Sequence, residues 1–77
     1  MNQYQLGNIL RDMYNGAPKG YKATNIHLFG IKYSDTRNDY SVKEIVKSSG
    51  LNESYVTEVN KGIKLSRYVE VKNSKRG

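Results

Sequence analysis

Residues 41–61 read SVKEIVKSSGLNESYVTEVNK, and the spacing of their apolar side chains decides the fold. Val42, Ile45 and Val46 recur at intervals of three and four, which places apolar groups on one face of a helix. A second set with helical spacing follows, made up of Tyr55, Val56 and Val59. The stretch therefore predicts two short amphipathic helices in succession.

Residues that cap helices mark the ends of both predicted helices. Ser41 precedes the first helix and Glu44 follows three residues later, which is the spacing of a capping box. Gly50 follows the last apolar residue and can adopt a positive φ at little cost, so it ends the helix and redirects the chain sharply. Asn52 is the expected N-cap of the second helix. The prediction is a pair of helices joined by a tight glycine turn.

The polar side chains of the second predicted helix are expected to face outward. They are Glu53, Ser54, Thr57, Glu58, Asn60 and Lys61. A helix in the major groove of DNA must offer hydrogen-bonding side chains of moderate length to base edges, beginning near its N-terminus. Asparagine, serine, threonine and lysine meet that requirement.

This stretch resembles the helix-turn-helix family of DNA-binding proteins over about a quarter of the chain. The resemblance rests on Ile45, Gly50, Leu51, Val56 and Val59. Two positions depart from the family pattern, since Val46 stands where a small residue is usual and Ser49 where an apolar one is commoner. The resemblance implies sequence-specific binding of double-stranded DNA, in transcriptional regulation or DNA targeting.

The resemblance also implies which residues touch DNA. Contacts to bases or nearby phosphates are expected from Asn52, Ser54, Thr57 and Lys61, with Asn60 as a further DNA contact. Contacts to the phosphate backbone are expected from Lys43, Lys47, Lys64 and Arg67. A homodimer would suit this function, because one short helix reads few base pairs and a two-fold site doubles the contact.

A protein-binding module is the alternative function, in which the same helical hairpin docks a partner as an adaptor or inhibitor. It would use Glu53 and Glu58 directly, with tyrosines as interface anchors. Both carboxylates oppose DNA binding unless each has a partner. Glu58 can pair with Lys61 at i,i+3, and Glu53 can complement the helix dipole. Binding of single-stranded nucleic acid or RNA through exposed tyrosines is a third alternative.

Length and composition exclude several classes of function. The 77 residues predict one domain over residues 1–72, too small for a deep substrate pocket and its supporting shell, so neither an enzyme nor a small-molecule substrate is expected. The chain has no cysteine and a single histidine, His27 in an apolar segment, so no metal site, cofactor or catalytic residue is predicted. No apolar run suits a membrane span or signal peptide, which predicts a cytoplasmic protein with no membrane partner.

The net charge of +6 is concentrated near the C-terminus. Residues 1–59 hold seven Lys or Arg against six Asp or Glu, whereas residues 60–77 hold six against one. Fixed cations beside a groove-reading helix would neutralise phosphates and release counterions. Residues 73–77 are expected to form a basic flexible tail.

The rest of the chain is expected to support this helix pair. Apolar spacing predicts a helix over residues 4–14, and glycine and proline predict a loop over residues 15–20. Residues 23–34 suit either a buried strand or a helix packed through its small residue Gly30. The helix is favoured because only residues 68–72, which alternate as a strand does, could pair with a strand. The predicted fold is mainly α: a small helical bundle with a short C-terminal β-strand or minimal wing.

Overall fold

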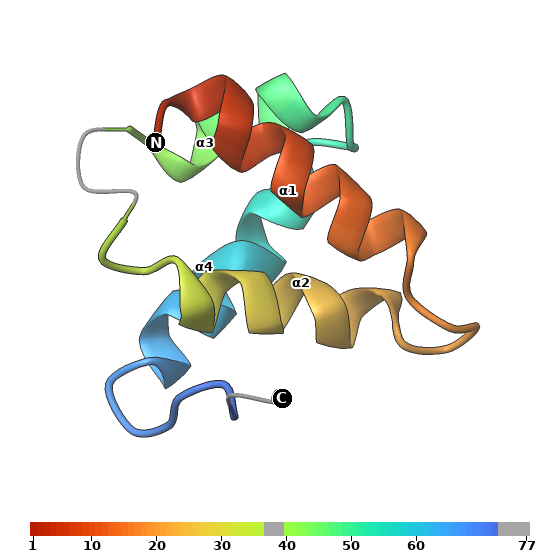
Figure 1. Ribbon diagram of the computed structural model, residues 1–77. Coiled ribbons are helices and arrows are strands. Elements are labelled where there is room, and N and C mark those ends of the chain that lie inside the picture. The colour runs from red at the N-terminus through yellow and green to blue at the C-terminus, as the bar shows by residue number, and fades with distance from the viewer. Residues whose placement is uncertain (37–39, 73–77) are drawn as a thin grey trace.

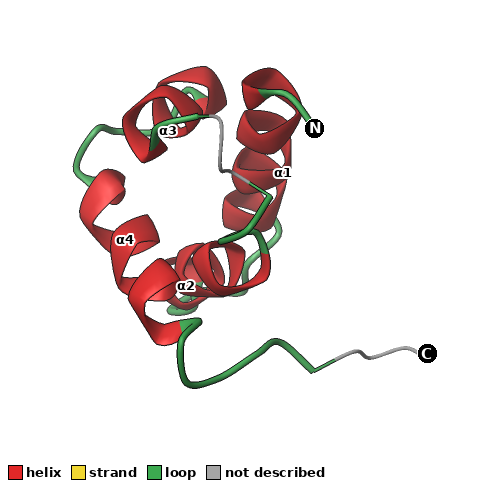
Figure 2. Ribbon diagram, turned by 90° about the vertical axis from the view of Figure 1, so that its left-hand side faces the viewer, coloured by secondary structure: helices red, strands yellow, loops and turns green. Residues whose placement is uncertain are grey.

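The computed structural model describes residues 1–36 and 40–72. These residues form four helices, α1 (Gln3–Asn15), α2 (Lys22–Lys32), α3 (Val42–Ser49) and α4 (Tyr55–Leu65) (Figure 1). α1 packs mainly against α3, and α2 packs mainly against α4. Figure 2 shows the two pairs closing around one core. The prediction of a small helical bundle is therefore confirmed, including the helix favoured for residues 23–34.

None of the helices in the described residues combines the length and the apolar character that crossing a membrane requires.

The hydrophobic core contains residues from all four helices. Its buried apolar side chains are Leu6, Leu10, Ile26, Phe29, Val42, Ile45, Val46 and Val59. Tyr14 and Tyr55 close one side of this core, with ring centroids 5.2 Å apart and hydroxyl oxygens 3.0 Å apart. That hydrogen bond raises the pKa of the Tyr55 hydroxyl and ties α1 to α4.

The predicted C-terminal strand is wrong for the residues that the structure describes. α4 continues through Gly62 to Leu65, a turn follows, and residues 69–72 have no strand partner in the described part of the chain. A strand needs a neighbour to satisfy its backbone N–H and C=O groups, and the one candidate neighbour, residues 23–34, forms α2. The predicted basic tail, residues 73–77, lies outside the described residues.

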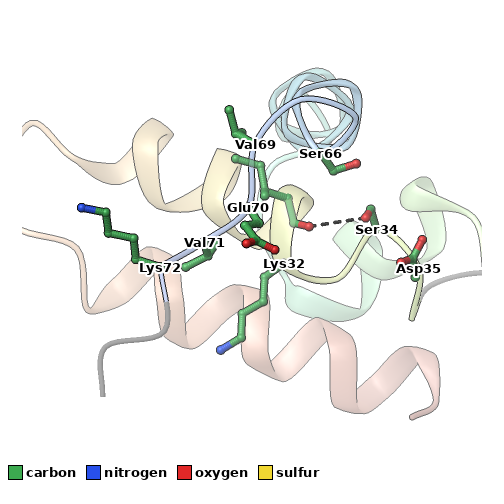
Figure 3. A pocket seen from close by; sticks show the side chains of 9 residues that line it. Lys32, Ser34, Asp35, Ser66, Val69, Glu70, Val71 and Lys72 are labelled. Atoms are coloured by element: carbon green, nitrogen blue, oxygen red, sulfur yellow. Dashed lines mark hydrogen bonds between the residues drawn. The ribbon is translucent and has the colours of Figure 1, made fainter. Parts of the chain in front are cut away.

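The C-terminal segment instead turns back across the end of α2. It borders an open cavity of about 510 Å³ together with Lys32, Ser34 and Asp35 (Figure 3). The Ser34 hydroxyl donates a hydrogen bond to the backbone carbonyl of Ile31 over 3.4 Å, so it serves the end of α2 rather than the cavity.

Two pairs of helices meet at glycine residues, where their backbones come into direct contact. A Cβ atom on Gly30 would lie 2.9 Å from the Cα atom of Gly62, and one on Gly62 would overlap the carbonyl oxygen of His27. A Cβ atom on Gly7 of α1 would lie 2.8 Å from the Cβ atom of Ser48 on α3. The packing role expected of Gly30 is confirmed. Gly62 is its counterpart on α4.

Replacing Gly62 by alanine should therefore destabilise the fold. Backbone atoms of α2 cannot move aside as a flexible side chain can, and overpacking of this kind costs about 1–3 kcal/mol. Urea unfolding followed by circular dichroism measures the loss. Gly16→Ala is the matched control, because Gly16 has an ordinary φ of −82° and its Cβ atom would meet only the Asp12 carbonyl at 3.1 Å. Equal stability of the two variants would contradict the direct backbone contact.

Candidate nucleic-acid interface

α3 begins and ends where the sequence predicts. The Ser41 hydroxyl accepts a hydrogen bond from the Glu44 backbone N–H at 3.1 Å, and the Glu44 carboxylate accepts one from the Ser41 backbone N–H at 3.4 Å. Gly50 has a φ of +78°, so it ends the helix in the left-handed region. The predicted capping box and glycine turn are both confirmed.

Ser49 and Val46, the two residues that depart from the family pattern, are both buried. The Ser49 hydroxyl donates to the Val46 carbonyl and accepts from the Leu51 backbone N–H at 3.1 Å. A buried hydroxyl is tolerated when it is hydrogen-bonded, and here it also connects α3 to the turn. Serine therefore replaces the usual apolar residue without leaving a buried polar group unsatisfied.

The start of α4 differs from the prediction. Asn52 was expected to be the N-cap, but α4 begins at Tyr55, and its N-cap Ser54 makes no side-chain cap hydrogen bond. The Asn52 side chain accepts a hydrogen bond from the Ser54 backbone N–H at 2.9 Å. Backbone bonds from Tyr55 to Asn52 and from Val56 to Glu53, each 3.0 Å, form tight turns before the helix. Asn52 thus shapes the turn, because its short side chain bonds the backbone two residues on.

α4 separates its buried and exposed side chains clearly. Val59 and Gly62 are buried against the rest of the domain. The exposed residues of α4 include Thr57, Asn60, Lys61 and Lys64. Thr57, Lys61 and Lys64 lie at i, i+4 and i+7, so they share one outward face. Asn52 and Ser54 are exposed just before it.

α3 and the turn after α4 contribute further exposed cations. Lys43 and Lys47 lie one turn apart on α3, and Arg67 follows the end of α4. Lys43 Nζ lies 3.6 Å from Glu53 Oε1, and the two side chains are 74% and 75% exposed. An ion pair this exposed is weak, so Lys43 can exchange Glu53 for another anion. The structure thus brings all nine predicted DNA contacts to exposed positions on α3, α4 and the segments that flank α4.

Residues 2–72 match the family described as HTH-like domain. The chain belongs to this family. No curated protein and no solved structure matches it. The family match spans all four helices, so it extends the resemblance from the helix pair to the whole bundle.

In the HTH-like domain, Glu58 of α4 belongs to a three-residue cluster with His27 and Lys61. His27 Nε2 on α2 lies 2.7 Å from Glu58 Oε1, and Lys61 Nζ lies 3.3 Å from Glu58 Oε2. The predicted i,i+3 pair of Glu58 and Lys61 is therefore confirmed. No sequence pattern indicated the contact between His27 and Glu58, because it joins residues 31 positions apart. His27 lies at the edge of the core, with its side chain 30% exposed, whereas Glu58 is 24% exposed.

The pKa of Glu58 is lowered from its ordinary value of 4.5. The main cause is the hydrogen bond from His27, which with Lys61 favours the charged carboxylate and outweighs the opposing effect of partial burial. Glu58 is thus kept ionised on the domain surface. Within residues 1–36 and 40–72, no group of three or more acidic, histidine or cysteine side chains could hold a metal ion.

Because the pKa of Glu58 is lowered, the stability of the HTH-like domain should depend on pH under acidic conditions, where Glu58 becomes protonated. A carboxylate with a lowered folded-state pKa stabilises the fold above its unfolded-state pKa, and this stabilisation is lost as the pH falls through the folded-state value. Between about pH 5 and pH 3, the free energy of unfolding of the natural protein should fall more steeply than that of Glu58→Gln. Urea unfolding at several pH values provides the measurement. Glu53→Gln, which removes an exposed acid, is the control and should keep the natural slope.

Proposed function

We propose that this HTH-like domain binds double-stranded DNA sequence-specifically, with α4 in the major groove. The observation that supports this most strongly is the outward face of α4. Thr57, Asn60 and Lys64 are exposed there, and none of these side chains has a hydrogen-bond partner among the described residues. Thr57 and Asn60 are available to accept and donate hydrogen bonds at base edges, and Lys64 is available to donate to a phosphate.

The dimensions of the helix pair suit this placement. α4 has 11 residues, which at 1.5 Å per residue gives a length of about 16 Å. In helix-turn-helix complexes the second helix enters the groove and the first crosses the backbone. With α4 so placed, Lys43 and Lys47 of α3 would meet phosphates on one side, and Lys64 and Arg67 on the other.

The two acidic residues near this face do not prevent binding. Glu53 is paired with Lys43, and Glu58 is paired with both His27 and Lys61. Each carboxylate therefore reaches the surface with its charge partly compensated. This arrangement supplies the partners that DNA binding requires of acids near a polyanion.

Phosphate contacts make the affinity depend on salt. Four contacts, from Lys43, Lys47, Lys64 and Arg67, give an expected slope of about −3.6 for log affinity against log salt concentration, or roughly 100-fold weaker binding at 200 mM than at 50 mM salt. Lys64→Ala should reduce the slope by about one unit. Fluorescence anisotropy of a labelled mixed-sequence duplex provides both values.

Lys19→Ala is the matched control for the loss of one charge. Lys19 is exposed in the loop between α1 and α2. This loop lies away from α4 (Figure 1). This variant should keep the natural slope. If both variants lost the same amount of salt-dependence slope, the overall charge of the protein, and not contacts made by α4, would account for DNA binding.

Thr57 and Asn60 are the proposed base readers. A preferred duplex can be selected from a randomised library with the natural protein. Thr57→Ala or Asn60→Ala should each weaken binding to this duplex by about 1–3 kcal/mol, because one base contact is lost. Binding to an unrelated duplex should change little, because phosphate contacts remain. Thr24→Ala, at an exposed position of α2, is the control. Equal weakening of binding to both duplexes would show that Thr57 and Asn60 do not recognise bases.

We further propose a biological role in transcriptional regulation or DNA targeting in the cytoplasm. The proposed form is a homodimer, because it would read a two-fold site. Sedimentation of the complex on duplexes with one and two half-sites measures the stoichiometry.

A second candidate function, protein binding, is favoured by an apolar patch formed by Leu65, Tyr68 and Val69. These side chains are 43%, 82% and 49% exposed. If protein binding is the main function, the same anisotropy titration should show no retention of duplex DNA even at low salt.

A further inference from the structure

The contact between His27 and Glu58 joins the scaffold to the proposed DNA-binding face. His27 belongs to α2, which supports the bundle, whereas Glu58 and Lys61 belong to α4. Glu58 uses both carboxylate oxygens, one 2.7 Å from His27 and the other 3.3 Å from Lys61. The histidine and the lysine therefore share one negative charge.

The other groups that face His27 are few among the described residues. His27 lines an open hollow with Lys61, Lys64, Leu65 and Tyr68. On α2 itself, the positions three and four residues away from it carry no charge, being Ala23, Thr24, Gly30 and Ile31. Glu58 is thus the one carboxylate that contacts His27 in the described residues.

The charge of this cluster depends on whether His27 is protonated. With a neutral imidazole, Lys61 is the only cation among the described residues that contacts Glu58, so it is held in the pair. With an imidazolium, His27 compensates Glu58 by itself, and the cluster gains one positive charge. Lys61, whose side chain is 57% exposed, is then free to turn toward solvent or a phosphate.

We propose that His27 is a proton-dependent positioning residue for the DNA-binding face: protonated His27 neutralises Glu58 and releases Lys61 to a DNA phosphate, so that DNA binding tightens as the pH falls. This inference rests on the proposed function and adds its regulation. His27 does not itself touch DNA in this scheme.

The pH range follows from the chemistry of the cluster. Histidine is the side chain that ordinarily changes charge between about pH 5 and pH 8, and His27 is the only histidine of the chain. Because the pKa of Glu58 is lowered by its hydrogen bond with His27, the carboxylate stays ionised across that range. We therefore assign the proposed change of charge in the cluster to His27.

The size of the effect follows from counterion release. One added phosphate contact contributes a slope of about 0.9, which corresponds to about eightfold tighter binding at 0.1 M salt. The natural protein should therefore bind a mixed-sequence duplex about eightfold more tightly at about pH 5.5 than at pH 8.

Two variants isolate the proposed switch. His27→Gln keeps an amide N–H that can reach Glu58 but cannot gain a proton, so most of the pH dependence should disappear, leaving only the contribution of groups such as the terminal amine. Glu58→Gln leaves Lys61 without its carboxylate, so at pH 8 this variant should already bind about as tightly as the natural protein does at pH 5.5. Circular dichroism verifies that each variant is folded, and Glu58→Gln tests the inference by itself if His27→Gln fails to fold.

The titration of the His27 ring, followed by NMR in the free protein, is a readout that does not require DNA. A charge change between about pH 5 and pH 8 supports the inference, and a ring that does not titrate in that range overturns it. Equal pH dependence in the natural protein and His27→Gln overturns the inference and leaves DNA binding intact. Absence of duplex binding by the natural protein at both pH values overturns the proposed function, and the inference with it.

Discussion

The backbone contact between Gly30 and Gly62 fixes the position of α4, and the proposed DNA-binding face depends on it. Where Gly30 and Gly62 meet, no side chain separates the two helices, so α4 lies directly on α2 at this point. That contact sets the rotation of α4 about its own axis, because Gly62 must face α2. Val59 then points into the core, and Thr57, Lys61 and Lys64 are left on the outward face. A packing requirement in the core thereby selects which side chains the surface presents.

The same contact gives Glu58 its partner. Gly62 packs against the backbone of His27. The His27 side chain therefore reaches Glu58, which lies one turn before Gly62 on α4. An acid on a DNA-binding helix is unfavourable when it has no counter-charge, because it repels phosphates. Here a helix from outside the helix-turn-helix supplies a hydrogen-bond partner for Glu58, and Lys61 of α4 supplies a cation. The two halves of the bundle therefore contribute to one surface.

The features that the sequence predicted correctly are local ones. Ser41 and Glu44 lie three residues apart, and Gly50 needs only its own backbone freedom, so both could be inferred without tertiary structure. The contact of His27 with Glu58 depends on how α2 and α4 pack, which no local pattern encodes. The prediction of a strand at residues 68–72 was wrong for a related reason. Its alternation rested on two valines, and such a pattern forms a strand only where a partner is present.

Glu53 and Glu58, the two acidic residues near the proposed DNA-binding face, are paired in physically different ways. Lys43 and Glu53 are both largely exposed, so water screens their attraction and an approaching phosphate can replace Glu53 at little cost. Glu58 is mostly covered, and its pair with His27 is held by the packing of α2 on α4. Under the proposed function, DNA would therefore open the first pair, whereas the second pair would be held by the helix packing until the charge of His27 changed.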